Sequence, residues 1–456
     1  VAKEKGLEPL ALLIFAQLPV KNSRDEILSK YINFEKGVKT TDEALSGALD
    51  IIAEKISDRA DIRSYLRKTT YNQGNIVSKV KKDFKDKKTK FETYYDFSEL
   101  VKKSPSHRIL AMQNGEKEKV LSWKIEVDED TALEFIDSKV LKIDKQYIFY
   151  EDILDAVDDS FKRLIFPSLE KEVLNLKIEE AEKEAINVFS KNLKNLLLSP
   201  PAGDKMILAV DPGFRTGCKV AVIDKNGNFM EYMAIFPNEP QKRTTEAENV
   251  ILGFIKKYEI ELISIGNGTA SKESSIFINQ VIKKNKLNVK SIMVSEAGAS
   301  VYSASDAAIK EFSNLDITVR GAISIGRRLQ DPLAELVKID AKSIGVGQYQ
   351  HDVNQAQLKK SLDLTVESAV NFVGVELNTA SAELLSYVSG IGNAIAQNIV
   401  KFRKENSNFK NRKQLLKVTK LGNKAYEQCA GFLRIRNSEN PLDNSAIHPE
   451  SYHIVE

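Results

Sequence analysis

The feature that most constrains the fold of this chain is a change in the spacing of its apolar residues after about residue 200. Before this point, apolar side chains recur mainly at the spacing of amphipathic helices. After it, three short apolar runs follow one another, at Ile207–Val210, Val220–Ile223 and Met230–Phe236. The segments between them are rich in turn residues, as in Asp224–Asn228. This pattern predicts three consecutive strands joined by tight turns.

Helices and strands alternate after this group of strands. Amphipathic segments at Glu246–Tyr258 and Ser274–Lys284 predict helices, and they lead into apolar runs at Leu262–Ile265 and Ser291–Val294. A meander of three strands followed by alternating helix and strand is the order of the ribonuclease-H-like α/β fold, whereas a doubly wound sheet places a helix after its first strand. We therefore expect a ribonuclease-H-like domain over residues 205–331.

The region before this domain is predicted to be mostly helical. Thr40 and Glu43 have the spacing of a capping box, and the apolar residues of Leu45–Ile56 follow at helix spacing. One segment, Leu121–Val127, instead alternates apolar and polar residues, which predicts a strand. Pro200–Gly203 then forms a linker. A chain of 456 residues is too long for one core, and we expect about three domains.

Charge, cysteine content and hydropathy narrow the class of protein. Lys and Arg number 67 against 64 Asp and Glu, so the net charge is only +3 and a nucleic-acid surface must come from local clustering. Cys218 and Cys429 fall in different predicted domains, which favours free thiols in a cytoplasmic protein over a disulfide or a zinc site. No apolar run approaches the roughly 20 residues that span a bilayer, so no membrane partner is expected.

A helix-hairpin-helix motif is predicted near the carboxyl end of the chain. Leu385 and Val388 end one apolar helix face, Ile395 and Ile399 begin the next, and Gly390–Gly392 forms the bend between them. Glycines can adopt positive φ and let the backbone approach a phosphate, while free amides at the start of the second helix donate to its oxygens. Such a contact recognises the nucleic-acid backbone and not its sequence.

A second copy of the hairpin lies at Val418–Gly422, with Lys420 at the position of Gly390. We expect this copy to be the weaker amide site, although its lysine adds a charge. The alternative is that both hairpins are only turns between packed helices; the surrounding basic residues, including Lys410, Arg412 and Lys413, favour nucleic acid. The residues predicted to bind nucleic acid are Gly390, Ile391, Gly392, Asn393, Lys401, Arg403, Lys404, Lys420, Leu421, Gly422, Asn423 and Lys424.

Three acidic residues of the α/β domain are candidates for a catalytic metal site. Asp211 ends the first predicted strand, Glu296 follows the last, and Asp331 comes after a predicted helix. A nuclease of this fold needs several carboxylates at one sheet edge to hold Mg²⁺, and we expect these three to converge. The strand that leads into Asn267, however, supplies no carboxylate. Asp211 is equally well placed to hydrogen-bond the turn that follows it.

A lysine-rich segment interrupts the helical region. Lys79–Lys90 contains seven lysines and is interleaved with aromatic residues such as Phe84 and Phe91. Lysines and aromatics together suit a phosphate backbone with stacked bases. Because Asp83 and Asp86 dilute the charge, we expect this segment to be a solvated surface instead.

Five stretches of the sequence resemble the Tex family of transcription-accessory proteins. The first, Ala209–Lys219, reads AVDPGFRTGCK. The others are Gly266–Ser271, Val294–Ser303, Arg327–Asp340 and Ser343–Val353. Ser104–Arg108 in the helical region and Gly390–Gly392 in the hairpin extend the resemblance over nearly the whole chain.

The resemblance implies a ribonuclease-H-like domain of the YqgF type and a core shared with the eukaryotic elongation factor that travels with RNA polymerase. It also implies that Asp211, Glu296 and Asp331 are remnants of an acidic site, with Asn267 where related resolvases usually offer a carboxylate. Members of the family usually carry a longer helical N-terminus and a C-terminal OB-fold RNA-binding domain. We therefore interpret the chain as a fragment that lacks both.

We expect a multidomain, mostly α-helical protein with one α/β domain and a tandem helix-hairpin-helix module. The predicted parts are a helical region with a small strand-containing insert (1–200), the YqgF-type domain (205–331), a linker and helix (332–370), the hairpin module (371–440) and the start of a truncated further domain (441–456).

The expected function is sequence-independent binding of RNA and/or DNA as a scaffold in transcription or RNA metabolism. RNA polymerase is an expected partner, and no small-molecule substrate is expected. The alternative is a metal-dependent nuclease or resolvase that acts through the acidic residues. The scaffold requires no cofactor, and Mg²⁺ is expected only if the acidic site is active.

Overall fold

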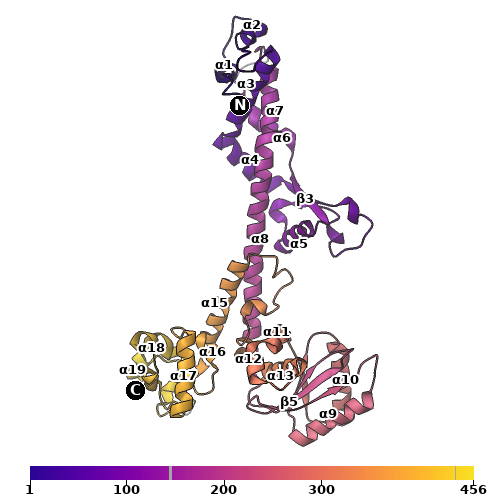
Figure 1. Ribbon diagram of the computed structural model, residues 1–456, viewed down its shortest axis with the longest axis vertical. Helices are drawn as coiled ribbons and strands as arrows, with labels where there is room; N and C mark the ends of the chain where they lie inside the picture. Colours follow the sequence, from indigo (N-terminus) through magenta and orange to yellow (C-terminus); the bar gives the residue numbers. More distant parts are fainter. Residues whose placement is uncertain (143–145, 437, 456) are drawn as a thin grey trace. The chain divides into compact units, whose positions relative to one another are not determined.

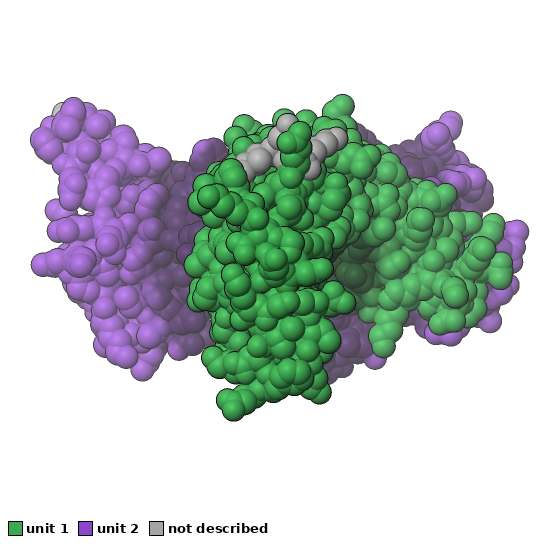
Figure 2. Space-filling view, turned by 90° about the horizontal axis from the view of Figure 1, so that it is seen from above, with its two compact units in different colours: residues 1–185 green, residues 186–456 purple. Residues whose placement is uncertain are grey.

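The computed structural model describes residues 1–142, 146–436 and 438–455. The chain divides into two compact units, residues 1–185 and 186–456, which Figure 2 shows in different colours. The long helix α8 (Phe166–Leu197) begins in the first unit and ends in the second. No helix among the described residues is long and apolar enough to cross a membrane.

The first unit is built mainly from helices that pack around one apolar core. These helices are α1 (Glu8–Ala16), α2 (Arg24–Ser29), α3 (Thr41–Ser57), α4 (Ala60–Gln73), α6 (Glu129–Val140), α7 (Tyr150–Asp159) and the first part of α8. Thr40 caps α3 by accepting a hydrogen bond from the Glu43 amide at 3.1 Å, which is one half of the predicted capping box. The Glu43 carboxylate accepts from the Lys39 amide at 2.6 Å and not from the Thr40 amide. Ile52 and Ile56 from α3 and Ile153 from α7 are fully buried in this core.

A small antiparallel sheet forms the strand-containing part of the first unit. Its strands are β1 (Asn75–Val80), β2 (Asp96–Leu100) and β3 (Leu121–Glu126), in the order β2-β1-β3, and helix α5 (Ser106–Lys117) packs beside β3. Residues of β3 are alternately buried and exposed, which confirms the strand predicted from Leu121–Val127. Figure 1 shows β3 and α5, in purple, beside the long helix α8, in magenta.

The second unit contains the predicted α/β domain. Its sheet has the strands β4 (Ile207–Asp211), β5 (Cys218–Ile223), β6 (Phe229–Ile235), β7 (Leu262–Gly266) and β8 (Lys290–Val294), in the order β6-β5-β4-β7-β8. The pairs β4–β5 and β5–β6 are antiparallel, whereas β4–β7 and β7–β8 are parallel. The predicted ribonuclease-H-like order is therefore confirmed.

Helices cover both faces of this sheet. Successive residues of a strand point to opposite faces, and the apolar residues of β4 are buried on both. Leu208 and Val210 belong to a core with α9 (Thr244–Tyr258) and α10 (Ser271–Lys284). Ile207 and Ala209 belong to a second core with α13 (Ile317–Gln330). The short helices α11 (Ala299–Ala304), α12 (Asp306–Glu311) and α14 (Pro332–Leu336) lie before and after α13 in the sequence. The result is a three-layer domain (Figure 1).

The hairpin module follows helix α15 (Gln355–Val373). It contains α16 (Ala382–Ser386), α17 (Asn393–Asn406), the 3-10 helix η6 (Arg412–Lys417) and α18 (Asn423–Cys429). Two short strands, β9 (Val375–Glu376) and β10 (Leu433–Arg434), pair in parallel and join the beginning of the module to its end. The predicted mostly helical chain with an α/β domain and hairpins is thus confirmed.

Candidate nucleic-acid interface and acidic site

The first hairpin is a tight turn that starts helix α17 directly. The Ile391 amide donates to the Val388 carbonyl at 2.9 Å, and Gly390 takes a φ of +82° between them. Gly392 is extended, with φ −85° and ψ 169°, and is the N-cap of α17. Its carbonyl accepts the first bond of the helix, from the Ala396 amide at 3.0 Å. The three residues Gly390–Gly392 therefore form both the turn and the N-cap of the helix.

The second hairpin has the same backbone path. The Leu421 amide donates to the Val418 carbonyl at 3.1 Å, and Gly422 is the extended N-cap of α18. Lys420 adopts a φ of +71°, close to that of Gly390, although a lysine is rarely found in this region. The expected weakening of the second amide site does not appear in the backbone, because Lys420 forms the same turn as the glycine.

Both hairpins leave backbone donors free at the start of the following helix. Among the described residues, none accepts a hydrogen bond from the amides of Asn393–Ile395 or of Asn423–Ala425. Gly392 and Gly422 are exposed, and no other atom lies within 4 Å of where a Cβ atom would stand on either. Helix N-termini attract anions through such amides and the helix dipole. Each hairpin thus presents free and accessible backbone amides at the start of a helix.

The two hairpins pack against each other. A Cβ atom on Gly390 would lie 2.7 Å from the Cβ of Gln428 and 3.1 Å from the Ala425 carbonyl oxygen, both on α18. In return, Asn398 on α17 donates to the Thr419 carbonyl of the second hairpin at 2.8 Å. Asn398 and Gln428 hold equivalent positions, five residues after Asn393 and Asn423. Gly390 is therefore required for packing, while Gly392 remains open.

The surroundings of the first hairpin are partly acidic. A cavity of about 300 Å³ lies beside it and is lined by Glu367 together with residues 386–392. The Glu367 carboxylate accepts a hydrogen bond from the Ser389 hydroxyl at 3.4 Å. Lys401, on the next helix, forms an ion pair with Glu405 at 3.8 Å. The Glu367 carboxylate reduces the positive charge available to a phosphate at this hairpin, while Lys401 and Glu405 lie farther along α17.

The surroundings of the second hairpin are basic. Four exposed lysines on η6, the turn and the first turn of α18 have no ion-pair or hydrogen-bond partner for their ammonium groups among the described residues. They are Lys413, Lys417, Lys420 and Lys424. Sequence reasoning missed Lys417, although its spacing from Lys413 and Lys420 places all three in one short segment. The second hairpin therefore combines free amides with free cations.

Arg403 has a structural role in the hairpin module. Its guanidinium donates to the carbonyls of Leu377 at 2.9 Å and Ala380 at 3.0 Å, and burial lowers its pKa. These bonds fix the segment before α16 against α17. Both bonds come from Nη1, so this nitrogen is engaged with protein, and the predicted contact with nucleic acid stays a prediction. Lys404, one residue later, is exposed.

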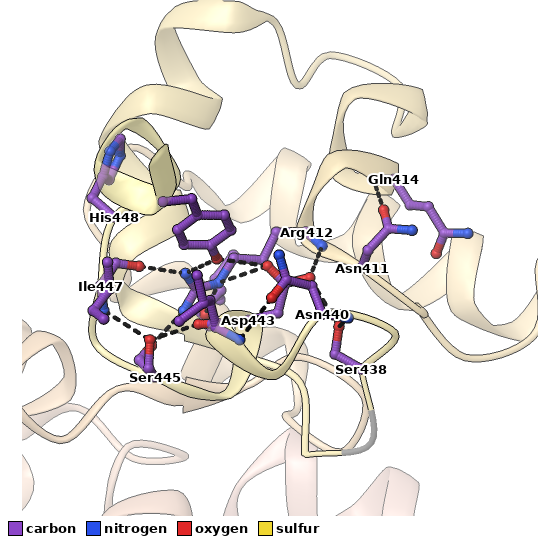
Figure 3. A network of polar contacts seen from close by, with 12 residues as sticks. Asn411, Arg412, Gln414, Ser438, Asn440, Asp443, Ser445, Ile447 and His448 are labelled. Atoms are coloured by element: carbon purple, nitrogen blue, oxygen red, sulfur yellow. Dashed lines mark hydrogen bonds and ion pairs between the residues drawn. The ribbon is translucent and has the colours of Figure 1, made fainter. Parts of the chain in front are cut away.

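Arg412 is also removed from the basic surface that its sequence position suggested. It is 1% exposed, and its side chain donates to the carbonyls of Leu433 and Ile447, both at 2.7 Å. The Asp443 carboxylate accepts a hydrogen bond from the Arg412 amide at 3.1 Å. Figure 3 shows Arg412 at the centre of this network. It ties the segment after residue 440 to the hairpin module and is not accessible to a phosphate.

Two of the three candidate acidic residues lie close together at the sheet edge. Asp211 ends β4, and no hydrogen bond joins its side chain to another described residue. Burial, with a smaller contribution from the Glu296 carboxylate, raises the pKa of Asp211 to about 6, against an opposing effect of Lys219. Glu296 lies over a glycine turn: a Cβ atom on Gly266 would stand 2.9 Å from its Oε2. The side chain of Asp211 thus does not hydrogen-bond the turn.

Asp331 does not join this pair. It follows the end of α13, whereas Asp211 lies beside Gly321 near the start of that helix, ten residues or roughly 15 Å away. Asp331 is exposed and caps α14, accepting a hydrogen bond from the Ala334 amide at 2.9 Å. Among the described residues, no group of three His, Cys, Asp or Glu side chains is arranged to hold a metal ion. The expected convergence of three carboxylates is therefore absent from this part of the chain.

The loop that carries Glu296 is fixed by two polar residues. Asn267 accepts a hydrogen bond from the Glu296 amide at 3.0 Å through its side-chain oxygen. Arg328 donates to the carbonyls of Ser295 at 2.9 Å and Ala297 at 2.7 Å. Asn267 therefore positions the loop at the place where sequence comparison with resolvases expects a carboxylate.

An ionic network involves several charged residues of the Arg327–Asp340 stretch. Arg327 pairs with Glu311 at 2.7 Å, and Lys338 pairs with Glu335 at 2.8 Å and with Glu311 at 3.6 Å. These groups lie on α12, α13 and the segment around α14 and hold them together. Charged residues of this stretch therefore contribute to the packing of the α/β domain.

Comparison with known protein families agrees with this architecture. The family model of the Tex protein YqgF-like domain matches residues 205–330, and that of the Tex central region matches residues 21–189. The chain belongs to the Tex family. A helix-hairpin-helix motif matches residues 370–434 and an HHH domain matches residues 440–456. This Tex-family chain therefore carries helix-hairpin-helix nucleic-acid-binding motifs.

Several curated relatives match the Tex-family chain over its length. It is 47% identical to the uncharacterized protein YdcI of Bacillus subtilis over 99% of this chain and 63% of the relative. It is 43% identical to the transcriptional accessory protein Tex of Neisseria gonorrhoeae over the whole chain and 60% of the relative. It is 34% identical to the human S1 RNA-binding domain-containing protein 1 over the whole chain and 51% of the relative. The chain thus spans between about half and two thirds of these proteins.

Proposed function

We propose that this chain binds RNA or DNA through the hairpin module without reading its sequence. The observation that carries the proposal is the pair of helix N-termini whose amides are free and whose N-cap glycines are open to solvent. Backbone amides and lysines contact phosphates, which are the same in every sequence. The lysines beside the second hairpin add the long-range attraction that a chain with a net charge of only +3 otherwise lacks.

We further propose that binding serves a scaffold role in transcription or RNA metabolism, with RNA polymerase as a partner. The names of two relatives support this: one is called a transcriptional accessory protein, and another is called an S1 RNA-binding domain-containing protein. Co-sedimentation of the purified chain with purified RNA polymerase, with and without nuclease treatment, tests the protein contact. A complex that survives nuclease treatment supports a direct contact, and loss of the complex contradicts it.

Titration of labelled nucleic acid tests the binding proposal. We expect a duplex of ~30 base pairs to bind with an affinity that falls steeply between low and moderate salt, because each phosphate contact releases counterions. Two unrelated sequences are expected to bind within about threefold of each other, since backbone contacts carry no sequence information. No binding at low salt, or a large preference for one sequence, contradicts the proposal.

The second candidate function is a metal-dependent nuclease, and the proximity of Asp211 and Glu296 is the observation in its favour. Two carboxylates can hold one Mg²⁺ together with substrate phosphates. They do not fit a two-ion hydrolytic site, which needs more carboxylates at the same edge. We therefore propose that the α/β domain does not cleave nucleic acid efficiently. Incubation of branched and single-stranded substrates with Mg²⁺ or Mn²⁺ tests this, and cleavage that Asp211→Asn abolishes contradicts it.

The raised pKa of Asp211 gives this substitution a second readout. Because the pKa is about 6 in the folded chain and 3.8 in the reference state, the acidic side chain contributes stability at low pH that is lost as the pH rises through 6. Asp211→Asn is therefore expected to raise the free energy of unfolding at pH 7.5 by at most about 3 kcal/mol and to have little effect at pH 4. An equal effect at both pH values contradicts the electrostatic origin of the shift.

A further inference from the structure

The segment Lys79–Lys90 concentrates positive charge in the first unit. It contains seven lysines and two aspartates, so its formal charge is +5, which exceeds the +3 of the entire chain. It begins at the end of β1 and leads through the 3-10 helix η1 (Lys82–Phe84) toward η2 (Glu92–Tyr94) and β2. We call this segment the lysine loop. Such a density of like charges is unfavourable unless water, salt or an anionic partner screens it.

Specific hydrogen bonds give the lysine loop a defined conformation. At its start, the Lys81 amide donates to the Val120 carbonyl at 2.9 Å, which joins the loop to the residue before β3. In its middle, the Lys87 amide donates to the Phe84 carbonyl at 3.0 Å. The Tyr95 hydroxyl donates to the Lys87 carbonyl at 2.7 Å from the chain beyond the loop. The lysines are therefore presented from a backbone that is already ordered, which lowers the entropy lost on binding.

The aromatic residues around the loop point toward protein. Phe91 is 2% exposed and forms a small core with Val120 and Leu121. Phe84, Tyr94 and Tyr95 are partly buried against the same core. The base stacking that the sequence pattern suggested is therefore not offered by Phe91. The aromatics hold the loop in place and leave its outer surface to the lysines.

Most of the lysines lack an anionic partner. Lys90 pairs with Glu118 at 2.7 Å, and the Lys87 ammonium lies 5.3 Å from the centre of the Phe84 ring. Six exposed lysines have no ion-pair or hydrogen-bond partner for the ammonium group among the described residues: Lys79, Lys81, Lys82, Lys85, Lys87 and Lys88. No ion pair joins them to Asp83 or Asp86, so the neighbouring aspartates do not neutralise them locally.

We propose that the lysine loop is a second binding site for nucleic acid, which contacts the phosphate backbone without stacking on bases. An anionic lipid surface is less suited to it, because the aromatic residues that would insert among lipids are held in the small core. The site lies in the first unit, uses no residue of the hairpins and so goes beyond the function proposed above. When two sites of one chain contact the same polymer, effective concentration raises the overall affinity.

A four-lysine variant tests this site in the full chain. It carries Lys81→Gln, Lys82→Gln, Lys85→Gln and Lys88→Gln. The matched control removes four exposed lysines from elsewhere in the same unit, with Lys21→Gln, Lys30→Gln, Lys36→Gln and Lys39→Gln. Both variants lose the same charge, and both are expected to fold, because all eight side chains are exposed. Circular dichroism and thermal unfolding verify this.

The readout is the affinity for a duplex of ~30 base pairs as a function of salt. We expect the four-lysine variant to bind about tenfold more weakly at low salt and its log–log salt slope to fall by about 2 to 4, at roughly 0.9 per lost contact. The control is expected to stay within about twofold. Equal affinity and slope in the four-lysine variant, or an equal loss in the control, overturns the proposal.

Two further arms identify the ligand and separate this site from the hairpins. Two other anionic ligands are titrated with the same variants: phosphatidylserine-containing vesicles in one experiment and a polyglutamate peptide in another. Loop-dependent binding to either one that exceeds binding to the duplex overturns the assignment to nucleic acid. The four substitutions are also introduced into Gly392→Asp/Gly422→Asp. A further tenfold loss of duplex affinity in that background supports an independent site. If the two hairpin substitutions alone do not weaken binding, that result contradicts only the hairpin proposal.

Discussion

The two hairpins share one backbone conformation but differ in their surroundings. In both, a residue with positive φ precedes a buried apolar residue and an extended N-cap glycine, and the following three amides are free. The first hairpin has a glycine at the positive-φ position and a cavity lined by Glu367. The second has Lys420 at that position, between Lys417 and Lys424.

This difference separates two contributions to phosphate binding, the hydrogen bonds of the amides and the charge of the neighbouring side chains. The amide geometry is equal in the two hairpins, so a difference in affinity between them reports the electrostatics of the neighbouring side chains. Exposed charges attract a polyanion over about a Debye length, whereas amides act only at contact. We therefore expect the second hairpin to contribute more to binding and the first to contribute more to the stability of the module.

The largest expected effect is on stability. Gly390→Ala places a Cβ atom 2.7 Å from the Cβ of Gln428 at a φ of +82°. We expect it to lower the free energy of unfolding of the module by about 2 kcal/mol, since both strain and steric overlap oppose it. Thermal or urea unfolding measures this. Lys420→Gly is the matched control and should not destabilise; a loss equal to that of Gly390→Ala contradicts the packing difference.

The next effect concerns the amides of the second hairpin. In Gly422→Asp, the new carboxylate is expected to accept hydrogen bonds from the free amides of α18 and to repel phosphate. No atom obstructs a Cβ there, and aspartate is a better N-cap than glycine by a few tenths of a kcal/mol, so stability should not fall. We expect about tenfold weaker binding, or about 1.4 kcal/mol, in an anisotropy titration. Unchanged affinity with an intact fold contradicts the role of these amides.

Removing only the cations at the same hairpin is expected to have a smaller effect. The double variant Lys420→Gln/Lys424→Gln keeps the free amides but loses two charges that have no partner among the described residues. We expect about fivefold weaker binding and a salt slope reduced by about 2, at roughly 0.9 per contact. The control is Lys401→Gln, which removes a lysine already paired with Glu405 and should change binding less than twofold. An unchanged slope in the double variant excludes direct phosphate contacts.

The smallest effect is expected at the first hairpin. Gly392→Asp makes the same chemical change as Gly422→Asp, but next to the Glu367 carboxylate and not among free lysines. We expect binding to weaken about threefold, because less of the total attraction originates there. The same titration measures it. A loss as large as that from Gly422→Asp shows that the surroundings do not distinguish the hairpins.

The positions of the strands along the chain and of the hairpins could be predicted from the sequence because they depend on local patterns. Alternation of buried and exposed residues marks β3, and the spacing of apolar runs marks the meander. The hairpin glycines are recognised by their position between two apolar helix faces. For these features, neighbours in the sequence determine the structure.

The availability of charged side chains could not be predicted in this way. Arg403 and Arg412 read as basic flanking residues, but distant carbonyls of Leu377 and Leu433 accept their hydrogen bonds. Asp331 follows the predicted helix as expected, yet the length of α13 places it far from Asp211. Each outcome depends on contacts between segments that are separated in the sequence, which neither composition nor periodicity describes.

The most direct test of the hairpin site observes the two N-cap glycines during binding. Glycine-selective ¹⁵N labelling of the full chain, with Gly392 and Gly422 assigned by substitution, follows their amide resonances as duplex nucleic acid is added. We expect both resonances to move in proportion to saturation, with the larger change at Gly422. Full saturation of the chain with both resonances unmoved would contradict phosphate binding at the hairpins.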